Sequence, residues 1–152
     1  MVARVSITVN TAKLAVFIEK LGENASTTVD ETAIEIQARA SQLAPRDTGS
    51  LAESIYVNNG EESDYPARAG RARALNPGVV ILEEIRPEFV VSLFGSDDSG
   101  HTAVVGVAAS HGIFQEYGTR FMRAQPFMTP SVEPMRDEFV SAMTQTVRDA
   151  AP

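Results

Sequence analysis

The tripeptide Asp47-Thr48-Gly49 is the most suggestive catalytic motif in the sequence. It matches the tripeptide of aspartic proteases, in which two carboxyl groups share one proton, so a homodimer would have to supply the pair. The surrounding residues argue against this chemistry. The Asp of those enzymes follows an apolar strand, whereas Asp47 follows a predicted helix end at Ala44-Pro45 and the charged Arg46. An adjacent arginine favours the ionised carboxylate, which is the wrong state for a shared proton. A dimeric aspartic protease is therefore kept only as an alternative.

Other catalytic and metal-binding patterns are weaker. The two histidines, His101 and His111, have no partners at the spacing of a zinc site, which needs three or four ligands. Asp97 and Asp98 lie near His101, but their run lacks the alternating ligands of an EF-hand loop. Neither a phosphate-binding glycine loop nor a G-x-S-x-G elbow occurs. The sequence predicts a protein without enzymatic activity and without a catalytic, cofactor or metal site.

Composition narrows the classes further. The chain has 152 residues, which is the size of one domain, and we expect residues 1–152 to form a single domain. Its 13 basic and 20 acidic residues give a net charge of −7, a poor match for a protein that wraps nucleic acid. The absence of cysteine excludes disulfides and thiolate metal sites. No apolar run approaches the roughly 20 residues of a membrane span, and the N-terminus lacks the apolar core of a signal peptide.

Hydrophobic periodicity predicts the elements that surround these motifs. Alternation at residues 5–9 predicts a strand, and residues 11–44 have the period of a long helix, kinked or split near Gly22 and Asn24. Thr28 followed by Glu31 is a capping-box pattern that would restart a helix after that point. A strand is expected at residues 54–58. The apolar stripe of the helix is expected in the core, and it consists of Leu14, Ile18, Leu21, Ala25, Val29, Ala33, Ile36, Ala40 and Leu43.

The second half of the chain is predicted to hold most of the strands. Residues 59–78 are rich in Gly, Pro, Ala and Arg, which predicts a long loop or insertion. Its Arg68, Arg71 and Arg73 are expected either to meet phosphate or an acidic neighbour or to lie in solvent. Strands are expected at residues 79–84, 89–94 and 102–108. Thr129 is expected to cap a final helix with Pro130 at its first position. The fold class is α+β: a mostly antiparallel β-sheet packed by a long N-terminal helix and a C-terminal helix.

Residues 111–130 form an aromatic corner interrupted by Gly118 and Pro126. Phe114 and Tyr117 lie one helical turn apart, and we expect them to serve the core. Arginine and aromatic residues are enriched at interfaces, so a subunit interface is expected to use Arg120, Phe121 and Arg123 together with the three arginines of residues 59–78.

Two segments together resemble a known family. Residues 44–55 read A-P-R-D-T-G-S-L-A-E-S-I, residues 116–119 read E-Y-G-T, and residues 126–130 read P-F-M-T-P. In this order they are similar to the head–tail joining, or tail-component, family of long-tailed phages, the family of a lambdoid phage's gene product ten. The resemblance covers residues 29–147. It implies structural roles for Pro45, Asp47, Thr48, Gly49, Leu51, Ser54, Glu116, Tyr117, Gly118, Thr119, Pro126, Phe127 and Pro130.

The resemblance also implies a function. Members look like virion proteins of the neck or tail-completion region that are assembled in the host cytoplasm. They are expected to form a homo-oligomeric ring with six subunits. Such a ring lies between a head-side connector or stopper protein and a tail tube or tail terminator protein, and genomic DNA passes its lumen without being read. A tail terminator or minor tail protein is an alternative within the virion, and a host-side binding module is one outside it. From the residues themselves, Asp47 is expected to accept backbone N–H bonds, and Gly49 and Gly118 to adopt backbone angles that other residues avoid.

Overall fold

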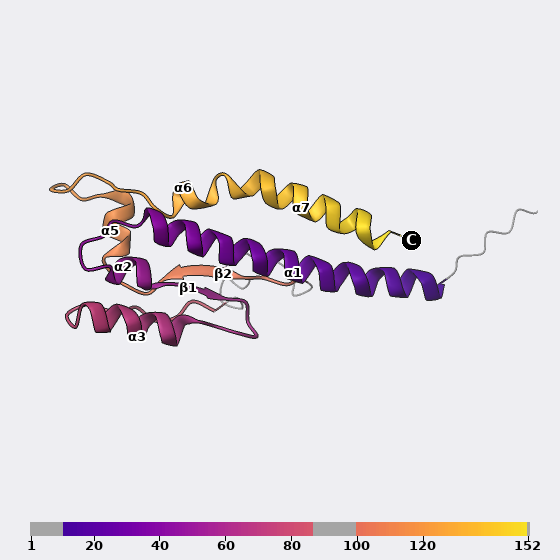
Figure 1. Ribbon diagram of the computed structural model, residues 1–152, viewed down its shortest axis with the longest axis horizontal. Coiled ribbons are helices and arrows are strands. Elements are labelled where there is room, and N and C mark those ends of the chain that lie inside the picture. Colours follow the sequence, from indigo (N-terminus) through magenta and orange to yellow (C-terminus); the bar gives the residue numbers. More distant parts are fainter. Residues whose placement is uncertain (1–10, 87–99, 152) are drawn as a thin grey trace, which may run out of the picture.

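The computed structural model describes residues 11–86 and 100–151 (Figure 1). The strands predicted at residues 5–9 and 89–94 lie outside these ranges. The described elements are α-helical except for one antiparallel pair of strands, and a long N-terminal helix and a C-terminal helix run alongside each other. The predicted α+β class is therefore confirmed.

Helix α1, Thr11–Leu43, is one continuous helix rather than two. The predicted interruption at Gly22 does not occur, because this glycine is exposed and has no neighbouring atoms that would bend the helix. The capping box at Thr28 does not form either. The Thr28 hydroxyl donates instead to the carbonyl oxygen of Asn24 at 2.9 Å, one helical turn back.

The sheet consists of β1, Ile55–Asn58, and β2, Val104–Val107. Ile55 lies opposite Val107, and Tyr56 lies opposite Gly106. The Tyr56 ring covers the backbone of Gly106, where a Cβ atom would lie 2.4 Å from the ring. The strand predicted at residues 79–84 is reduced to an isolated bridge between Ile81 and Ala109.

The outer edge of β1 is covered by side chains from other elements. Gln37 of α1 donates through Nε2 to the carbonyl oxygen of Ile55 at 3.0 Å. The backbone N–H of Val57 donates to Oδ1 of Asp64 at 2.8 Å, and the carbonyl oxygen of Val57 accepts from the backbone N–H of Asp64 at 3.2 Å. Gln37 is buried and also donates to Asp64 Oδ2 at 2.7 Å, so α1 and the segment after β1 close this edge together.

The segment predicted as a loop, residues 59–78, contains helix α3, Tyr65–Leu75, which corrects that prediction. Pro66 lies in the first turn, where a missing backbone N–H has no cost. The alanines and arginines that follow have good helix propensity, and the buried Ala69 and Ala72 let the helix approach its neighbours. Glycine and proline suggest a loop here, but Pro66 lies in the first turn of the helix and Gly70 on its exposed side.

The chain after β2 forms three helices: α5, Gly112–Tyr117, α6, Thr129–Val132, and α7, Met135–Ala150. Helix α7 runs antiparallel to α1, with Thr28 Oγ1 3.0 Å from Thr146 Oγ1 and Arg39 3.4 Å from Glu138. In Figure 1 the order of layers is α7, α1, the sheet and α3, so the C-terminal helix packs on α1.

The core lies between α1, α2 (Ser50–Glu53), β1 and the segment before α6. Of the predicted core stripe of α1, Ala33 and Ala40 in the second half are buried, whereas Leu43 in the same half is 50% exposed. Leu14 is 48% exposed and Ile18 is 59% exposed, so these two stripe positions do not lie in the core. The larger core cluster consists of Ala40, Ala44, Leu51, Ala52, Ile55, Ala109 and Phe127.

Candidate functional site

The turn after α1 is held by Thr48 and Gly49. The backbone N–H of Ser50 donates to Thr48 Oγ1 at 3.3 Å, and the Thr48 hydroxyl donates to Ser50 Oγ at 2.9 Å. Gly49 has φ = 80°, a left-handed conformation that favours glycine, as predicted. The predicted role of Asp47 is wrong, because the shorter Thr48 side chain takes the hydrogen bond. Within the described residues Asp47 is exposed and makes no hydrogen bond or ion pair.

The remainder of this motif is structural. Leu51 and Ile55 are buried in the core, and the Ser54 hydroxyl donates to the carbonyl oxygen of Leu51 at 2.7 Å. Ser54 is fully buried, and its own carbonyl oxygen accepts from the backbone N–H of Ala108. The apolar and hydroxyl positions of the motif thus connect α2 to both strands.

The Glu116 carboxylate links α5 to α6. Oε2 accepts from the backbone N–H groups of Phe127 and Met128 at 2.8 and 2.9 Å. Oε1 accepts from the backbone N–H of Thr129 at 2.9 Å and from its hydroxyl at 2.6 Å. The carboxylate therefore satisfies N–H groups at the start of α6 that have no partner within the helix. Thr129 was predicted to cap this helix itself, but it lies in the first turn and donates to Glu116 instead.

Burial alone would raise the pKa of Glu116, because a charged carboxylate loses hydration. The Thr129 hydroxyl and the three backbone N–H groups stabilise the charged form and outweigh that effect. The pKa of Glu116 consequently lies below its ordinary value.

A tight turn follows α5. Gly118 ends the helix with φ = 73°, as predicted, and a Cβ atom there would lie 2.7 Å from the backbone nitrogen of Ala124. Thr119 and Met122 exchange backbone hydrogen bonds, and Thr119 Oγ1 also accepts from Phe121 at 3.2 Å. Residues 119–123, which we call the tip, project at the end of the molecule remote from the start of α1 (Figure 1).

The aromatic residues of the corner divide differently from the prediction. Phe114 is 54% exposed and Tyr117 is 77% exposed, so neither serves the core. Helix α5 instead turns Gly112 and Glu116 inward, and a Cβ atom at Gly112 would lie 2.8 Å from Val107 Cγ1. Phe127, which follows Pro126, is the buried aromatic residue of this region.

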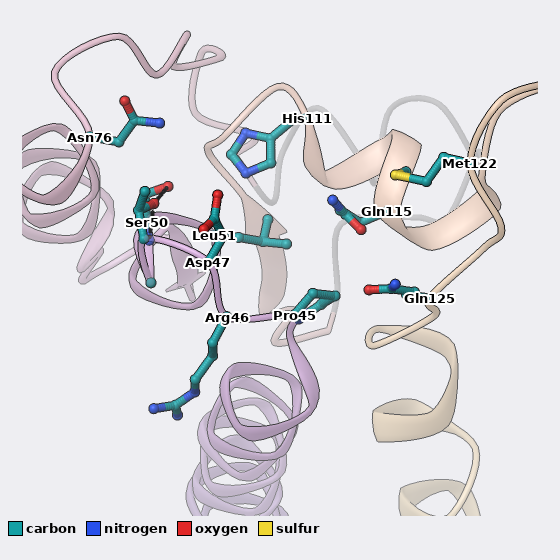
Figure 2. Close-up of a pocket in the computed structure, with 12 residues that line it drawn as sticks. Pro45, Arg46, Asp47, Ser50, Leu51, Asn76, His111, Gln115, Met122 and Gln125 are labelled. Carbon is teal, nitrogen blue, oxygen red and sulfur yellow. Dashed lines mark hydrogen bonds between the residues drawn. The ribbon is translucent and has the colours of Figure 1, made fainter.

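The first motif segment and the residues that flank the second, Gln115 and Gln125, form opposite walls of one cleft of about 600 Å³. Figure 2 shows Pro45 and Asp47 on one side and Gln115 and Gln125 on the other, with the Arg46 side chain directed away. Gln115 Oε1 is buried and has no hydrogen-bond partner. The cleft is lined by Pro45, Arg46, Asp47, Thr48, Gly49, Ser50, Leu51, Asn76, His111, Gln115, Met122 and Gln125.

Sequence reasoning did not identify His111, Gln115 and Gln125 as site residues. His111 and Gln115 are four residues apart at the start of α5, a spacing that places both on one side of a helix. Gln125 is joined to this helix because its backbone N–H donates to the carbonyl oxygen of Gln115 at 2.8 Å. That contact depends on the turn at Gly118 and has no signal in the sequence pattern.

The predicted interface arginines occupy different surroundings. Arg68 and Arg71 lie 3.6 and 3.7 Å from the Glu53 carboxylate, and Arg68 also pairs with Asp64 at 3.0 Å. Their acidic neighbour is therefore in the same chain. Arg73, in the last turn of α3, is exposed. At the tip, Arg120 lies 4.3 Å from the centre of the Phe121 ring, and Arg123 is exposed without an ion pair among the described residues.

The described residues contain neither a metal-binding cluster nor a membrane-spanning helix. In the described part of the chain, no group of three or more His, Cys, Asp or Glu side chains is placed to hold a metal ion. Helices long and apolar enough to cross a bilayer are likewise missing from residues 11–86 and 100–151.

The comparisons with known proteins give no match. No family model matches the sequence, and neither a curated protein nor a solved structure matches it.

Proposed function

We propose that the chain is a structural virion protein of the phage neck or tail-completion region. In this proposal, copies assemble into a homo-oligomeric ring, expected to be hexameric. The ring joins the head-side connector or stopper to the tail tube or tail terminator, and genomic DNA passes through its lumen.

One observation carries this proposal: the two segments of the phage-family resemblance form a single structural unit. The E-Y-G-T element binds the P-F-M-T-P element through the four hydrogen bonds of Glu116. The D-T-G element faces Gln115 and Gln125, the residues that directly precede these two elements, across the cleft. Residues separated by about seventy positions are coupled in space, which supports a shared origin with that family over a chance match of short motifs.

The charge of the chain is compatible with a DNA conduit. A net charge of −7 per copy, repeated around a ring, gives a lumen that repels phosphates and lets DNA pass without binding. Glu31 and Glu35 on α1 and Glu138 on α7 are exposed carboxylates on the two long helices. These helices are therefore candidates for the lumen-facing layer.

The alternatives have weaker support. Asp47 supplies the one carboxylate among the residues that line the cleft, so a protease dyad would need the second from another copy. No observation in the described residues favours that arrangement. A peptide-cleavage assay on the wild type and on Asp47→Asn addresses it directly, since cleavage that is lost in the variant would support the protease.

The proposal predicts that the chain is present in purified virions of the phage or prophage that encodes it. Mass spectrometry of the virions and negative-stain microscopy of the purified protein make the measurement. We expect the chain in virions and rings in the micrographs. Absence from virions would overturn the proposal, even if the purified chain is monomeric before it meets its neighbours. A gene located far from phage structural genes would favour the host-side binding module.

A further inference from the structure

We propose that the cleft receives the tip, residues 119–123, of a second copy of this chain, with Arg120 and Arg123 donating to acceptors on the cleft walls. This inference rests on the proposed ring and names the two surfaces that would join its subunits.

The cleft offers acceptors that its own chain leaves unused. Gln115 Oε1 is buried and has no donor, although nearly all buried polar atoms in folded proteins have one. Asp47 has no partner among the described residues. A ligand for this cleft must therefore bring N–H donors, and at Asp47 a positive charge. The cleft volume of about 600 Å³ is large enough for more than one side chain.

The tip offers the matching donors. Among the described residues, neither Arg120 nor Arg123 has a carboxylate partner, whereas Arg39, Arg68 and Arg71 are paired within the chain. A guanidinium group carries five donors and no acceptor, which suits a wall of amide and carboxylate oxygens. Phe121, 84% exposed beneath Arg120, adds an aromatic side chain of the kind that anchors interfaces.

The tip cannot fill the cleft of its own chain. The Thr119–Met122 hydrogen bonds close the turn, and Gln125 is bonded to Gln115 at its base. Met122 already lines the cleft from this base, whereas Arg120 and Arg123 are exposed and are not among the lining residues. The occupant must come from another molecule, and a second copy supplies the required chemistry.

The cleft walls at Asp47 and Gln115 and the exposed arginines of the tip are different surfaces, so a contact between them is heterologous. A heterologous contact that closes on itself generates a ring, whereas one that does not close generates a filament. Each copy would use its cleft toward one neighbour and its tip toward the other.

A cross-linking experiment on the full chain tests this pairing. The chain has no cysteine, so Asp47→Cys and Arg123→Cys introduce the only thiols, and the double variant keeps Arg120, Phe121 and the acceptor Gln115 Oε1 to hold the tip in the cleft. With a short bismaleimide cross-linker, the double variant is expected to give a ladder of dimers, trimers and larger species. Each single variant is expected to give no ladder. Arg136→Cys, on the exposed first turn of α7, replaces Arg123→Cys in the matched control, which should also give no ladder.

The outcomes separate this inference from the function on which it rests. A ladder confined to the Asp47/Arg123 pair supports the docking. Rings in the micrographs without that ladder would overturn the docking and leave the ring proposal intact. Absence from virions together with a monomeric, uncross-linked chain would overturn both. Thermal unfolding of each variant establishes that a missing ladder is not a folding defect, and the charge exchange described below tests the same pair without cysteines.

Discussion

Glu116 is the residue on which the corner depends. It is a buried carboxylate with four donors from three consecutive residues, so it joins α5 and α6 without any carboxylate–cation pair. Hydrogen bonds to charged groups are about twice as strong as neutral ones, and a buried group left without its partner is costly. The E-Y-G-T motif therefore has a physical reason that concerns folding rather than catalysis.

Replacing Glu116 by Gln is expected to lower the free energy of unfolding by about 2 kcal/mol, because one amide oxygen replaces two charged acceptors and the new NH2 group faces N–H donors. Urea denaturation measures this loss. Glu133→Gln, at an exposed position directly after α6, is the control and should change stability by less than about 0.5 kcal/mol. Equal stability of the two variants would contradict the role given to Glu116.

The same residue predicts a pH dependence. The folded-state pKa of Glu116 lies below the value of about 4.3 expected in the unfolded chain. Its contribution to stability is therefore complete above about pH 4.3 and is lost as the pH falls through the folded-state pKa. The stability difference between wild type and Glu116→Gln should shrink in this acidic range. A difference that stays constant down to pH 2 would contradict the assignment.

At the level of elements, the sequence predicted the helices more reliably than their contacts. The sequence predicts α1 because its apolar period persists over many turns. The sequence does not predict how α6 is capped, because the acceptor is Glu116 in another helix. Helix α3 was missed because Pro66 and Gly70 suggested a loop, although one lies in the first turn and the other is exposed. Because aromatic residues are apolar, the sequence predicts that α5 buries Phe114. In the structure Val107 approaches Gly112, and the side of α5 that carries Gly112 faces inward instead.

The turn between α5 and the tip requires glycine at position 118. Gly118→Val places a side chain at a positive φ and against Ala124 and Met122, so we expect a loss of at least about 2 kcal/mol in the free energy of unfolding. Thermal or urea unfolding makes the measurement, and virion titre reports the effect on assembly. Gly22→Ala is the matched control: it lies in α1 with no atom near its Cβ position and should stabilise the chain by up to about 1 kcal/mol. Normal stability and titre for Gly118→Val would contradict the assigned role.

The molecule as a whole carries exposed apolar surface at both ends. Leu14 and Ile18 are exposed in the first half of α1, and Tyr117 and Phe121 are exposed at and next to the tip. Only some residues of the apolar stripe that the sequence assigns to the core are therefore buried within one chain. Sequence periodicity identifies which side of a helix is apolar, but it does not distinguish burial within the chain from burial against a partner.

Exchanging the charges of the proposed contact tests the assembly at this scale. Arg123→Glu and Asp47→Arg alone each place like charges together, which should weaken ring formation at least about tenfold in protein concentration. The double variant restores an opposite-charge pair with its sense reversed and should recover rings. Mass photometry across a concentration series gives the measurement, with Arg136→Glu as the control. Equal defects in the double and single variants would contradict the pairing.

The covered edge of β1 has a consequence for how copies can meet. An open strand edge is a template on which further strands add without limit, and this leads to fibrous aggregates. Gln37 and Asp64 occupy the carbonyl oxygens of Ile55 and Val57 and the N–H of Val57 on that edge, so these groups are not free to pair with a foreign strand. These groups of β1 are thus protected from strand-to-strand association between copies of the chain, and the proposed ring would have to form through side-chain surfaces instead.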